Sequence, residues 1–205
     1  SCVISVVASA GFCLAVAVGP SLLADDGRER VRGVWYVSWS TPTRLLSEES
    51  DATLASLPEL GVNWVALRVT WYQTGFDTPS VYPGVFTPTD DALSHAVRHI
   101  HALGMKTMLG LQIDLCDPTG SDWRPGGKWH GQIEFPSEHL WTAWFDAYGQ
   151  YVLHYAELCR KCGVDMLCIG VELVLPATTH EQQWRDLITK VRAVYPGPLT
   201  YQANW

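Results

Sequence analysis

The chain has 205 residues, of which 47% are hydrophobic and 17% are charged, and its formal net charge is −7. This composition excludes a disordered chain, which would combine low hydrophobicity with a high density of charge. The negative balance argues against nucleic acid and anionic membranes as partners. Ten Trp and eight Tyr form a high aromatic load, which suits a packed core and also platforms for sugar rings.

Residues 1–24 form an uncharged segment rich in Val, Ala and Leu, and Asp25 and Asp26 are the first charges. The segment has the composition of the hydrophobic region of a secretory signal peptide, with Ala24 in a suitable cleavage position. No basic region precedes it, so we expect the true start of the protein to lie upstream of Ser1. We expect a secreted or extracellular protein. The alternative is a signal anchor, because the segment is nearly long enough to span a bilayer, and only then is membrane contact expected.

The first half of the mature part alternates strand-like and helix-like segments. The expected strands are Gly33 to Trp39, Asn63 to Val69 and Lys106 to Ile113. A helix is expected from Asp51 to Leu60, closed by Gly61, and a second begins at Thr87-Pro88-Thr89-Asp90 and stops at Gly104. A threonine cap with an acidic first turn is typical of a helix start, and glycine is typical of a helix end.

The second half continues the alternation. A long helix is expected from Ser137 to Cys162, a strand from Val164 to Leu173, a helix opened by the capping-box pattern Thr178-x-x-Glu181, and a strand from Leu199 to Trp205. The fourth strand is a nearly continuous apolar run, which is typical of a strand buried on both faces. Glu172 lies near its C-terminal end, where an ionised group is unfavourable unless its desolvation is compensated.

Five strands separated by four helices predict an α/β fold of right-handed β/α units. A doubly wound sheet and a (β/α)8 TIM barrel both fit. The long connections 70–86 and 114–136 follow strands, as active-site loops of a barrel do, and this asymmetry favours the barrel. Because a complete barrel needs about 250 residues, we interpret residues 25–205 as a fragment covering about the first five strands. An intact five-stranded domain is the alternative.

Sequence motifs for nucleotide binding, for a metalloenzyme and for a serine hydrolase are missing. The sequence contains no GxGxxG, GxxxxGK[ST], HExxH or GxSxG pattern, and the pair Cys159 and Cys162 is weak support for zinc or redox chemistry on its own. We therefore expect no cofactor and no metal. Disulfides among Cys116, Cys159, Cys162 and Cys168 are possible in an oxidising compartment, but their pairing cannot be read from the sequence.

Glu172 is the leading candidate for a catalytic carboxyl group, since barrel enzymes build their sites at the C-terminal strand ends. The alternative is a structural glutamate paired with an arginine. Asp114, at the end of the third strand, either bonds a sugar hydroxyl or caps its loop. Trp71 and Gln73, just past the second strand, are candidates for lining subsites, although Trp71 also fits the core.

Further candidates lie in the loops and at the C-terminus. Trp129 is either a stacking platform or part of the loop packing, and Asn204 and Trp205 would face the cleft of a barrel. Arg68 either supports a carboxylate or ends its strand in a salt bridge. His130 is interpreted as a polar loop residue and not as a catalytic base.

Several ordered blocks point to one family: TPTDDAL, HALGMKTMLGLQID, WHGQI, WFDAYGQYVLHYAELCRKCGVDMLCIGVEL and VRAVYPGPLTYQANW. From about Gly33 to Trp205 the chain resembles glycoside hydrolase family 113, β-mannanase-like TIM barrels of a large clan of retaining glycosidases. The resemblance implies that Glu172 is the general acid/base at the end of strand four. It also implies a glutamate nucleophile on strand seven, outside this chain, so we expect these 205 residues alone to be inactive.

The implied function is hydrolysis of O-glycosidic bonds in a β-linked polysaccharide or oligosaccharide, of the retaining endo-β-1,4-mannanase kind. Alternatives are a non-catalytic glycan-binding barrel and a glycosidase for another β-glycan. One departure bears on specificity: the wider clan usually has asparagine before the acid/base, and Val171 stands there in this chain. The acid is unaffected, but the sugar specificity stays open.

Overall fold

A single sheet organises the protein, which the computed structural model describes for residues 30–117 and 119–204. Its parallel strands pair in chain order as β1 (Gly33–Tyr36), β2 (Trp64–Gln73), β4 (Lys106–Leu115), β5 (Met166–Val171) and β6 (Leu199–Gln202), and the short β3 (Tyr82–Pro83) runs antiparallel to β2. A doubly wound sheet would reverse its strand order at a switch point. The unbroken order among these strands therefore selects the barrel type of winding.

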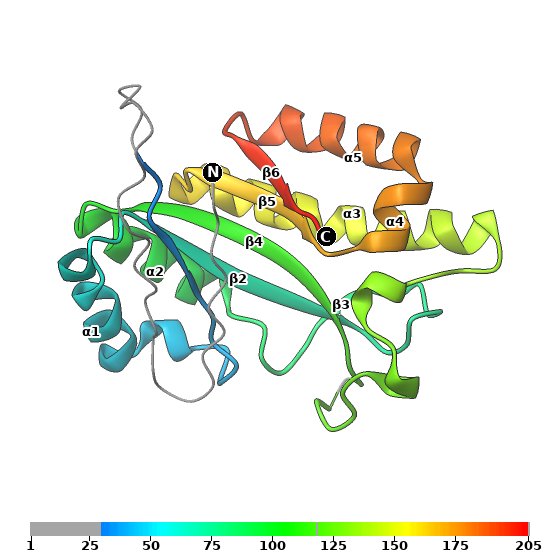
Figure 1. Ribbon diagram of the computed structural model, residues 1–205, viewed down its shortest axis with the longest axis horizontal. Helices are drawn as coiled ribbons and strands as arrows, with labels where there is room; N and C mark the ends of the chain where they lie inside the picture. Colours follow the sequence, from blue (N-terminus) through cyan, green and yellow to red (C-terminus); the bar gives the residue numbers. More distant parts are fainter. Residues whose placement is uncertain (1–29, 118, 205) are drawn as a thin grey trace, which may run out of the picture.

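Helices connect the strands and lie against the curved sheet (Figure 1). They are α1 (Glu48–Ser56), α2 (Asp90–Ala102), α3 (Glu138–Cys162), α4 (Val174–Thr179) and α5 (Glu181–Val194), with the 3-10 turns η1 (Arg44–Leu46), η2 (Pro58–Leu60), η3 (Pro125–Gly127) and η4 (His130–Gln132). Within the described residues, no helix is both long and apolar enough to cross a bilayer. The segment 1–24, expected to be a signal peptide or anchor, lies outside the described residues.

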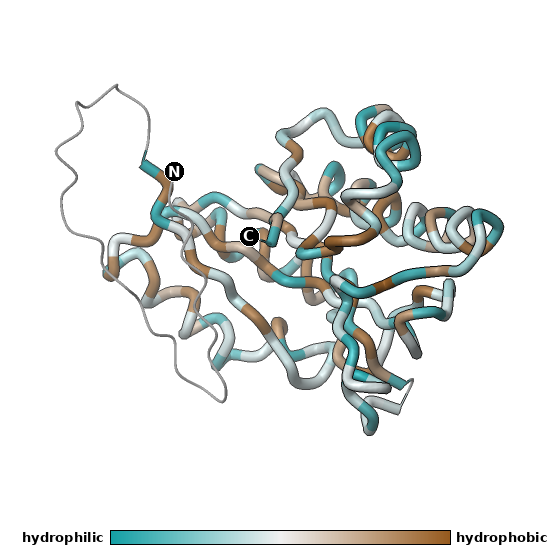
Figure 2. The backbone as a smooth tube through the Cα atoms, turned by 45° about the vertical axis from the view of Figure 1, so that its right-hand side comes forward, coloured by the Kyte–Doolittle hydropathy of each residue, from teal (hydrophilic) through white to brown (hydrophobic). Residues whose placement is uncertain are grey.

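Alternate residues of the strands serve two different surfaces. In β2 and β4 the odd-numbered side chains, such as Val65, Val69, Leu109 and Ile113, belong to the core packed under the helices. The even-numbered side chains face the opposite side, as the two-residue period of a strand requires. Figure 2 shows apolar stretches running along the central strands. The helix-free face is thus the one that can carry polar groups.

The helix α3 supplies the bulk of the aromatic core. Trp144, Tyr148 and Tyr151 follow each other at helical spacing and are fully buried against the sheet. The Tyr148 hydroxyl donates to the carbonyl of Ile169 at 2.6 Å, and the Tyr151 hydroxyl donates to that of Val69 at 2.8 Å. Because each buried hydroxyl has a partner, the rings add apolar burial without leaving an unpaired polar group.

Several expected boundaries are confirmed. The Thr89 hydroxyl accepts a hydrogen bond from the Ala92 amide at 3.1 Å and begins α2. Gly104 and Gly163 follow α2 and α3 with φ of 77° and 74°, the left-handed conformation that glycine adopts without a Cβ penalty. The long helix α3 begins one residue after the expected Ser137.

Other expectations are wrong in detail. The capping box at Thr178 does not form, because Thr178 lies inside α4 and its hydroxyl donates to the Val174 carbonyl at 2.8 Å. The expected helix from Asp51 to Leu60 is a shorter α1, capped by the Ser47 hydroxyl, followed by a separate 3-10 turn. β1 ends earlier than expected, whereas β2 and β4 continue to Gln73 and Leu115.

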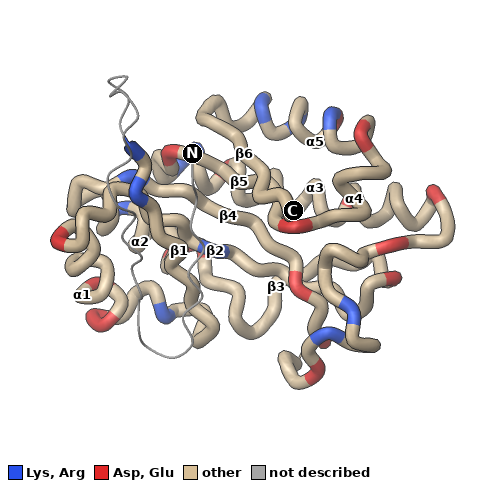
Figure 3. Tube along the Cα trace, viewed as in Figure 1, with Lys and Arg blue, Asp and Glu red and all other residues tan. Residues whose placement is uncertain are grey.

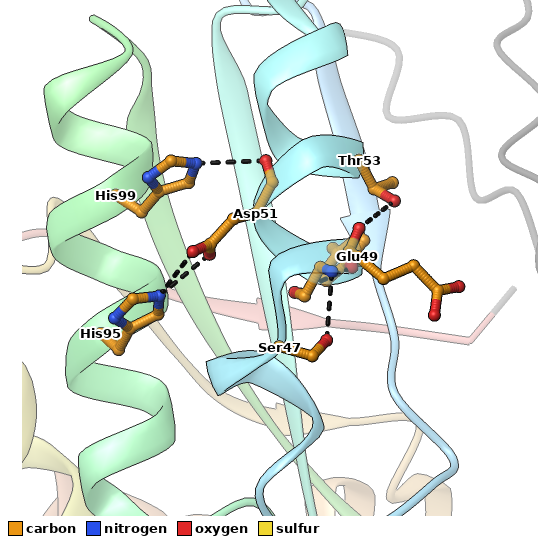
Figure 4. A network of polar contacts seen from close by, with 8 residues as sticks. Ser47, Glu49, Asp51, Thr53, His95 and His99 are labelled. Atoms are coloured by element: carbon orange, nitrogen blue, oxygen red, sulfur yellow. Dashed lines mark hydrogen bonds and ion pairs between the residues drawn. The ribbon is translucent and has the colours of Figure 1, made fainter.

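Polar contacts join α1 to α2 (Figure 4). The Nε2 of His95 lies 2.9 and 3.1 Å from the two carboxylate oxygens of Asp51, and the Nε2 of His99 donates to the Asp51 carbonyl at 3.2 Å. This clamp fixes the first two helices relative to each other. Cys116, Cys159, Cys162 and Cys168 are free thiols, so no disulfide links them.

Candidate active site

The carboxyl ends of the parallel strands meet at one edge of the sheet, where acidic positions follow β4 and β5 (Figure 3). The strand register places Tyr72 of β2 beside Asp114 of β4, with Thr70 beside Gln112 one step below. These side chains belong to the even-numbered, helix-free face. Polar groups from several strands are therefore brought together on one surface, as at the mouth of a barrel.

Glu172 stands directly after β5 in an unusual backbone conformation. Its φ is 51°, a left-handed conformation that a non-glycine residue adopts at a cost of about 1–2 kcal/mol. The Glu172 amide donates to the carbonyl of Gln202 in β6 at 2.8 Å, and its own carbonyl accepts from the Val174 amide at 3.0 Å. The neighbouring strand and the start of α4 thus hold the turn, and the Glu172 side chain stays 28% exposed.

Asp114 and His130 form the next part of the site. The Asp114 carboxylate accepts a hydrogen bond from the Gln112 amide at 2.7 Å, and its Oδ1 lies 3.3 Å from Nδ1 of His130. The Nε2 of His130 lies 3.8 Å from Oε2 of Glu172. His130 therefore connects the carboxyl group after β5 to the one at the end of β4.

The sequence interpretation of His130 as an ordinary loop residue missed this placement. Its side chain is only 12% exposed, and the turn η4 carries it back over the sheet from the long loop after β4. The one hint in the sequence is that the histidine directly follows Trp129 in this loop. No spacing rule connects it to Asp114 or Glu172.

Arg68 supplies positive charge on the same face. Its guanidinium carbon lies 5.2 Å from the centre of the Trp35 ring. Burial lowers the pKa of Arg68, and the negative charges of Asp114 and Glu172 oppose that shift. Of the two roles considered for Arg68, this electrostatic coupling favours support of the carboxylates.

Tyr72 and Trp123 extend the site outward along an aromatic surface. The Tyr72 ring is 3% exposed and meets the edge of Trp123 at 5.9 Å, and Trp123 stacks on Phe86 at 6.1 Å. Burial raises the pKa of the Tyr72 hydroxyl, with a further contribution from Asp114. Trp123 remains 44% exposed. No sequence pattern distinguishes Trp123 from the other aromatic residues of its loop.

The expected subsite role of Trp71 and Gln73 needs correction, because both lie on the helix side of the sheet. The Trp71 ring packs 4.8 Å from that of Tyr151, and its Nε1 donates to the Tyr155 hydroxyl at 3.1 Å. Gln73 is fully buried, and its Oε1 accepts from Nε1 of Trp144 at 2.9 Å. Since β2 continues through Gln73, these odd-numbered residues point under α3.

Of the three remaining candidates, the structure describes Trp129 and Asn204. The Trp129 ring lies over Gly131 and meets the His130 ring at 5.0 Å in an edge-to-face contact. It is therefore part of the loop packing at the border of the site. Asn204 is half-buried just beyond β6, two residues past the Gln202 carbonyl that anchors Glu172. Trp205 lies outside the described residues.

The arrangement suits proton transfer. Glu172 is a carboxyl group reachable from solvent, held at a strained turn, with the imidazole of His130 behind it and the half-buried guanidinium of Arg68 below. A carboxyl group in such a place can give a proton to a leaving group and take one from water, which is general acid–base catalysis.

Comparisons with known proteins agree on one family. The model of Glycoside Hydrolase Family 113 matches residues 35–205. Among solved structures, the chain is 30% identical to the GH113 β-mannanase AaManA from Alicyclobacillus acidocaldarius, with a TM-score of 0.74 over 85% of this chain and 54% of that one. A second GH113 β-1,4-mannanase is 26% identical, also with a TM-score of 0.74, over 85% of this chain and 55% of its own.

The fold extends to more distant glycosidases. The exo-β-1,4-mannosidase Op5Man5 from Opitutaceae bacterium strain TAV5 is 19% identical with a TM-score of 0.51, over 80% of this chain and 30% of that one, which is a likeness of fold. A comparison with curated proteins gave no match. The expected α/β fold, part of a (β/α)8 TIM barrel, is confirmed. The chain spans about half the length of the two family structures.

Proposed function

The chain belongs to glycoside hydrolase family 113, and we propose that the full-length protein cleaves β-1,4-linked mannan at internal bonds, with retention of anomeric configuration. The mannan-type substrate is supported by the two family structures named as β-mannanases, both covering 85% of this chain. A polysaccharide or oligosaccharide is thus the proposed partner, and the mechanism needs no cofactor.

The geometry of Glu172 carries the proposal. It stands at the carboxyl end of β5, the fourth of the strands that alternate with helices, where the family resemblance puts the general acid/base. The neighbouring strand holds the backbone of Glu172 in a left-handed turn, and this fixes the point from which the side chain leaves the sheet. Strain of this kind concentrates at functional sites, because the surrounding structure must maintain it.

In the proposed reaction, Glu172 gives its proton to the glycosidic oxygen while a second carboxylate attacks the anomeric carbon. The bond to the leaving sugar breaks and a glycosyl-enzyme forms. Water then attacks that intermediate, Glu172 takes the water's proton, and the free enzyme is restored. The family resemblance places the second carboxylate on a strand beyond β6, so these 205 residues alone are expected to be inactive.

We also propose that the protein acts outside the cytoplasm. The uncharged, apolar composition of residues 1–24 supports a secretory signal, or an anchor that would tie the barrel to a membrane. Mass determination of the mature N-terminus from the native source distinguishes the two. Cleavage near Ala24 supports secretion, and an intact segment in the membrane fraction supports the anchor.

The test of function compares the full-length protein with its Glu172→Gln variant on β-mannan, β-glucan and xylan. Glutamine keeps the shape of the side chain but has no acidic proton, so turnover should fall by roughly 10²–10⁴-fold. Retention is checked separately by NMR of the first-formed anomer. Equal rates for the two proteins would contradict the role of Glu172.

The substrate panel separates the alternatives. Glu172-dependent turnover of glucan or xylan instead of mannan would assign the barrel to another β-glycan. Oligosaccharide binding without turnover in either protein would indicate a glycan-binding barrel that has lost its chemistry.

A further inference from the structure

His130 lies between the two carboxyl groups of the site with one ring nitrogen unpaired. Its Nδ1 is 3.3 Å from Oδ1 of Asp114 and its Nε2 is 3.8 Å from Oε2 of Glu172. Nε2 is buried and has no hydrogen-bond partner among the described residues. Buried polar atoms without partners are rare, and each exception requires an explanation.

Asp114 determines where the first proton of the ring sits. A carboxylate oxygen only accepts, so the Nδ1 that faces it carries a hydrogen. The Gln112 amide donates to the same carboxylate at 2.7 Å and holds it in place. His130 is thereby oriented so that Nε2 points at Glu172. A ring that donates to both carboxylates carries a hydrogen on each of its two nitrogens.

The surroundings of the ring add few other charges. Asp114 from β4 and Glu172 after β5 face its two nitrogens, and Arg68 of β2 interacts with both carboxylates from below. The helix α4 packs against the turn η4 and contains no ionisable side chain. A carboxyl group thus faces each of the two ring nitrogens of His130.

We propose that His130 is a positioning residue for the acid, an inference that rests on the proposed function. Its Nε2–H binds Oε2 of Glu172, which leaves Oε1 to give its proton to the leaving oxygen. As that O–H bond breaks, negative charge develops on the carboxylate, and the Nε2–H stabilises it. In the second step Glu172 regains a proton from the attacking water, and His130 neither gains nor loses one.

The present separation of 3.8 Å is longer than a hydrogen bond. Catalytic hydrogen bonds are often long in the free enzyme and shorten when substrate binds. The proposal requires the Glu172 side chain, which is 28% exposed, to rotate toward Nε2 and close the gap.

Two substitutions of His130 test the contact with Asp114 and the contact with Glu172 separately. The amide nitrogen of His130→Asn takes the position of Nδ1 and keeps a donor toward Asp114, but it does not reach Glu172. The amide nitrogen of His130→Gln takes the position of Nε2 and keeps a donor toward Glu172. Thermal unfolding and circular dichroism of the full-length variants verify that each is folded.

Two substrates distinguish a role of His130 in acid catalysis from a role in packing alone. One is mannan, whose sugar leaving group needs a proton, and the other is a 2,4-dinitrophenyl β-mannooligosaccharide, whose leaving group does not. On mannan, His130→Asn should lose roughly 10–100-fold in kcat with little change in KM, a part of what general acid catalysis contributes. On the aryl substrate the kcat of His130→Asn should stay within about threefold of wild type. On mannan, His130→Gln should be faster than His130→Asn, because it keeps a donor toward Glu172. Equal losses on both substrates, or a wild-type rate for His130→Asn, would overturn the proposal.

A measurement without substrate keeps this inference distinct from the proposed function. The ring resonances of His130 are compared by NMR at one pH in the full-length protein and in Glu172→Gln. Because a carboxylate is a stronger acceptor than an amide, the Nε2 resonance should move, while the Nδ1 resonance, which faces Asp114, should stay. Identical ring resonances in the two proteins would exclude the contact, even in a protein that cleaves mannan. A shift confined to Nε2 supports the contact even if mannan is not the substrate.

Discussion

Replacing Gln73 by leucine tests whether this residue belongs to the core or to the cleft. Gln73 is fully buried, its Oε1 accepts from Nε1 of Trp144 at 2.9 Å, and its Nε2 donates to the Gly75 carbonyl at 2.7 Å. The half-buried Gly75 carbonyl can turn to water after the substitution, but the fully buried Trp144 N–H cannot. Leaving such a donor unpaired costs about 1–3 kcal/mol. The free energy of unfolding should fall by that amount, with KM unchanged.

A double-mutant cycle isolates the hydrogen bond from the change in shape. Trp144→Phe removes the donor and, because its ring is smaller, also leaves a cavity. In the double variant neither partner is left unpaired, so its loss should be smaller than the sum of the single losses by about 1–2 kcal/mol. Urea unfolding of the four proteins gives each free energy.

The matched control is a Gln→Leu substitution on the helix-free face of the sheet. Gln112→Leu removes the amide that holds Asp114 at 2.7 Å, so it should lower turnover more than Gln73→Leu does. If Gln73→Leu instead raised KM while stability stayed within about 0.5 kcal/mol, the assignment of Gln73 to the helix side would be refuted. A coupling energy near zero in the cycle would refute the hydrogen bond to Trp144.

Three further predictions follow from individual residues. Because Glu172 has a φ of 51°, Glu172→Gly should be more stable than Glu172→Ala by about 1–2 kcal/mol in urea unfolding, and equal stabilities would contradict a left-handed turn. A methyl group at Gly110 would lie 2.6 Å from Cζ3 of Trp35, so Gly110→Ala should cost about 1–3 kcal/mol. At Gly149 in α3 the methyl group would make an ordinary contact with Cδ1 of Leu187 at 3.8 Å, so Gly149→Ala should stabilise slightly. Burial raises the pKa of Tyr201 to about 12, above its usual value of about 10. The stabilisation that comes from the protonated Tyr201 hydroxyl in the folded protein is therefore complete below pH 10, and it is lost as pH rises through 12. Tyr201→Phe should flatten that decline, as followed by unfolding across pH, and an unchanged slope would count against it.

The sequence alone was sufficient for the order of the elements and for the principal candidate residue. Apolar runs of strand length and helical periodicity are local properties, so each parallel strand and each main helix could be placed within a few residues. The short antiparallel β3 fell within a segment that was expected to be a connection. Glu172 stood out for the same reason, since a carboxyl group is costly within an apolar run unless it has a function. Asp114 was found as the polar residue that ends its strand.

Tertiary structure decided which side of the sheet each residue serves. Trp71 and Gln73 were expected past the end of their strand, but pairing with β4 extends β2 through Gln73 and turns both under α3. In a strand apolar on both faces, composition does not tell the two faces apart, so only the position of the helices can.

For loops, too, the sequence alone does not show where a side chain lies, as His130 illustrates. The sequence determined that a histidine occurs in the long connection after β4, and nothing local distinguished it from other polar loop residues. Only the folded chain brings it within 3.3 Å of Asp114 and 3.8 Å of Glu172. The physical reason is that strands and helices have fixed periods that a sequence can express, whereas the path of a long loop is set by what it packs against.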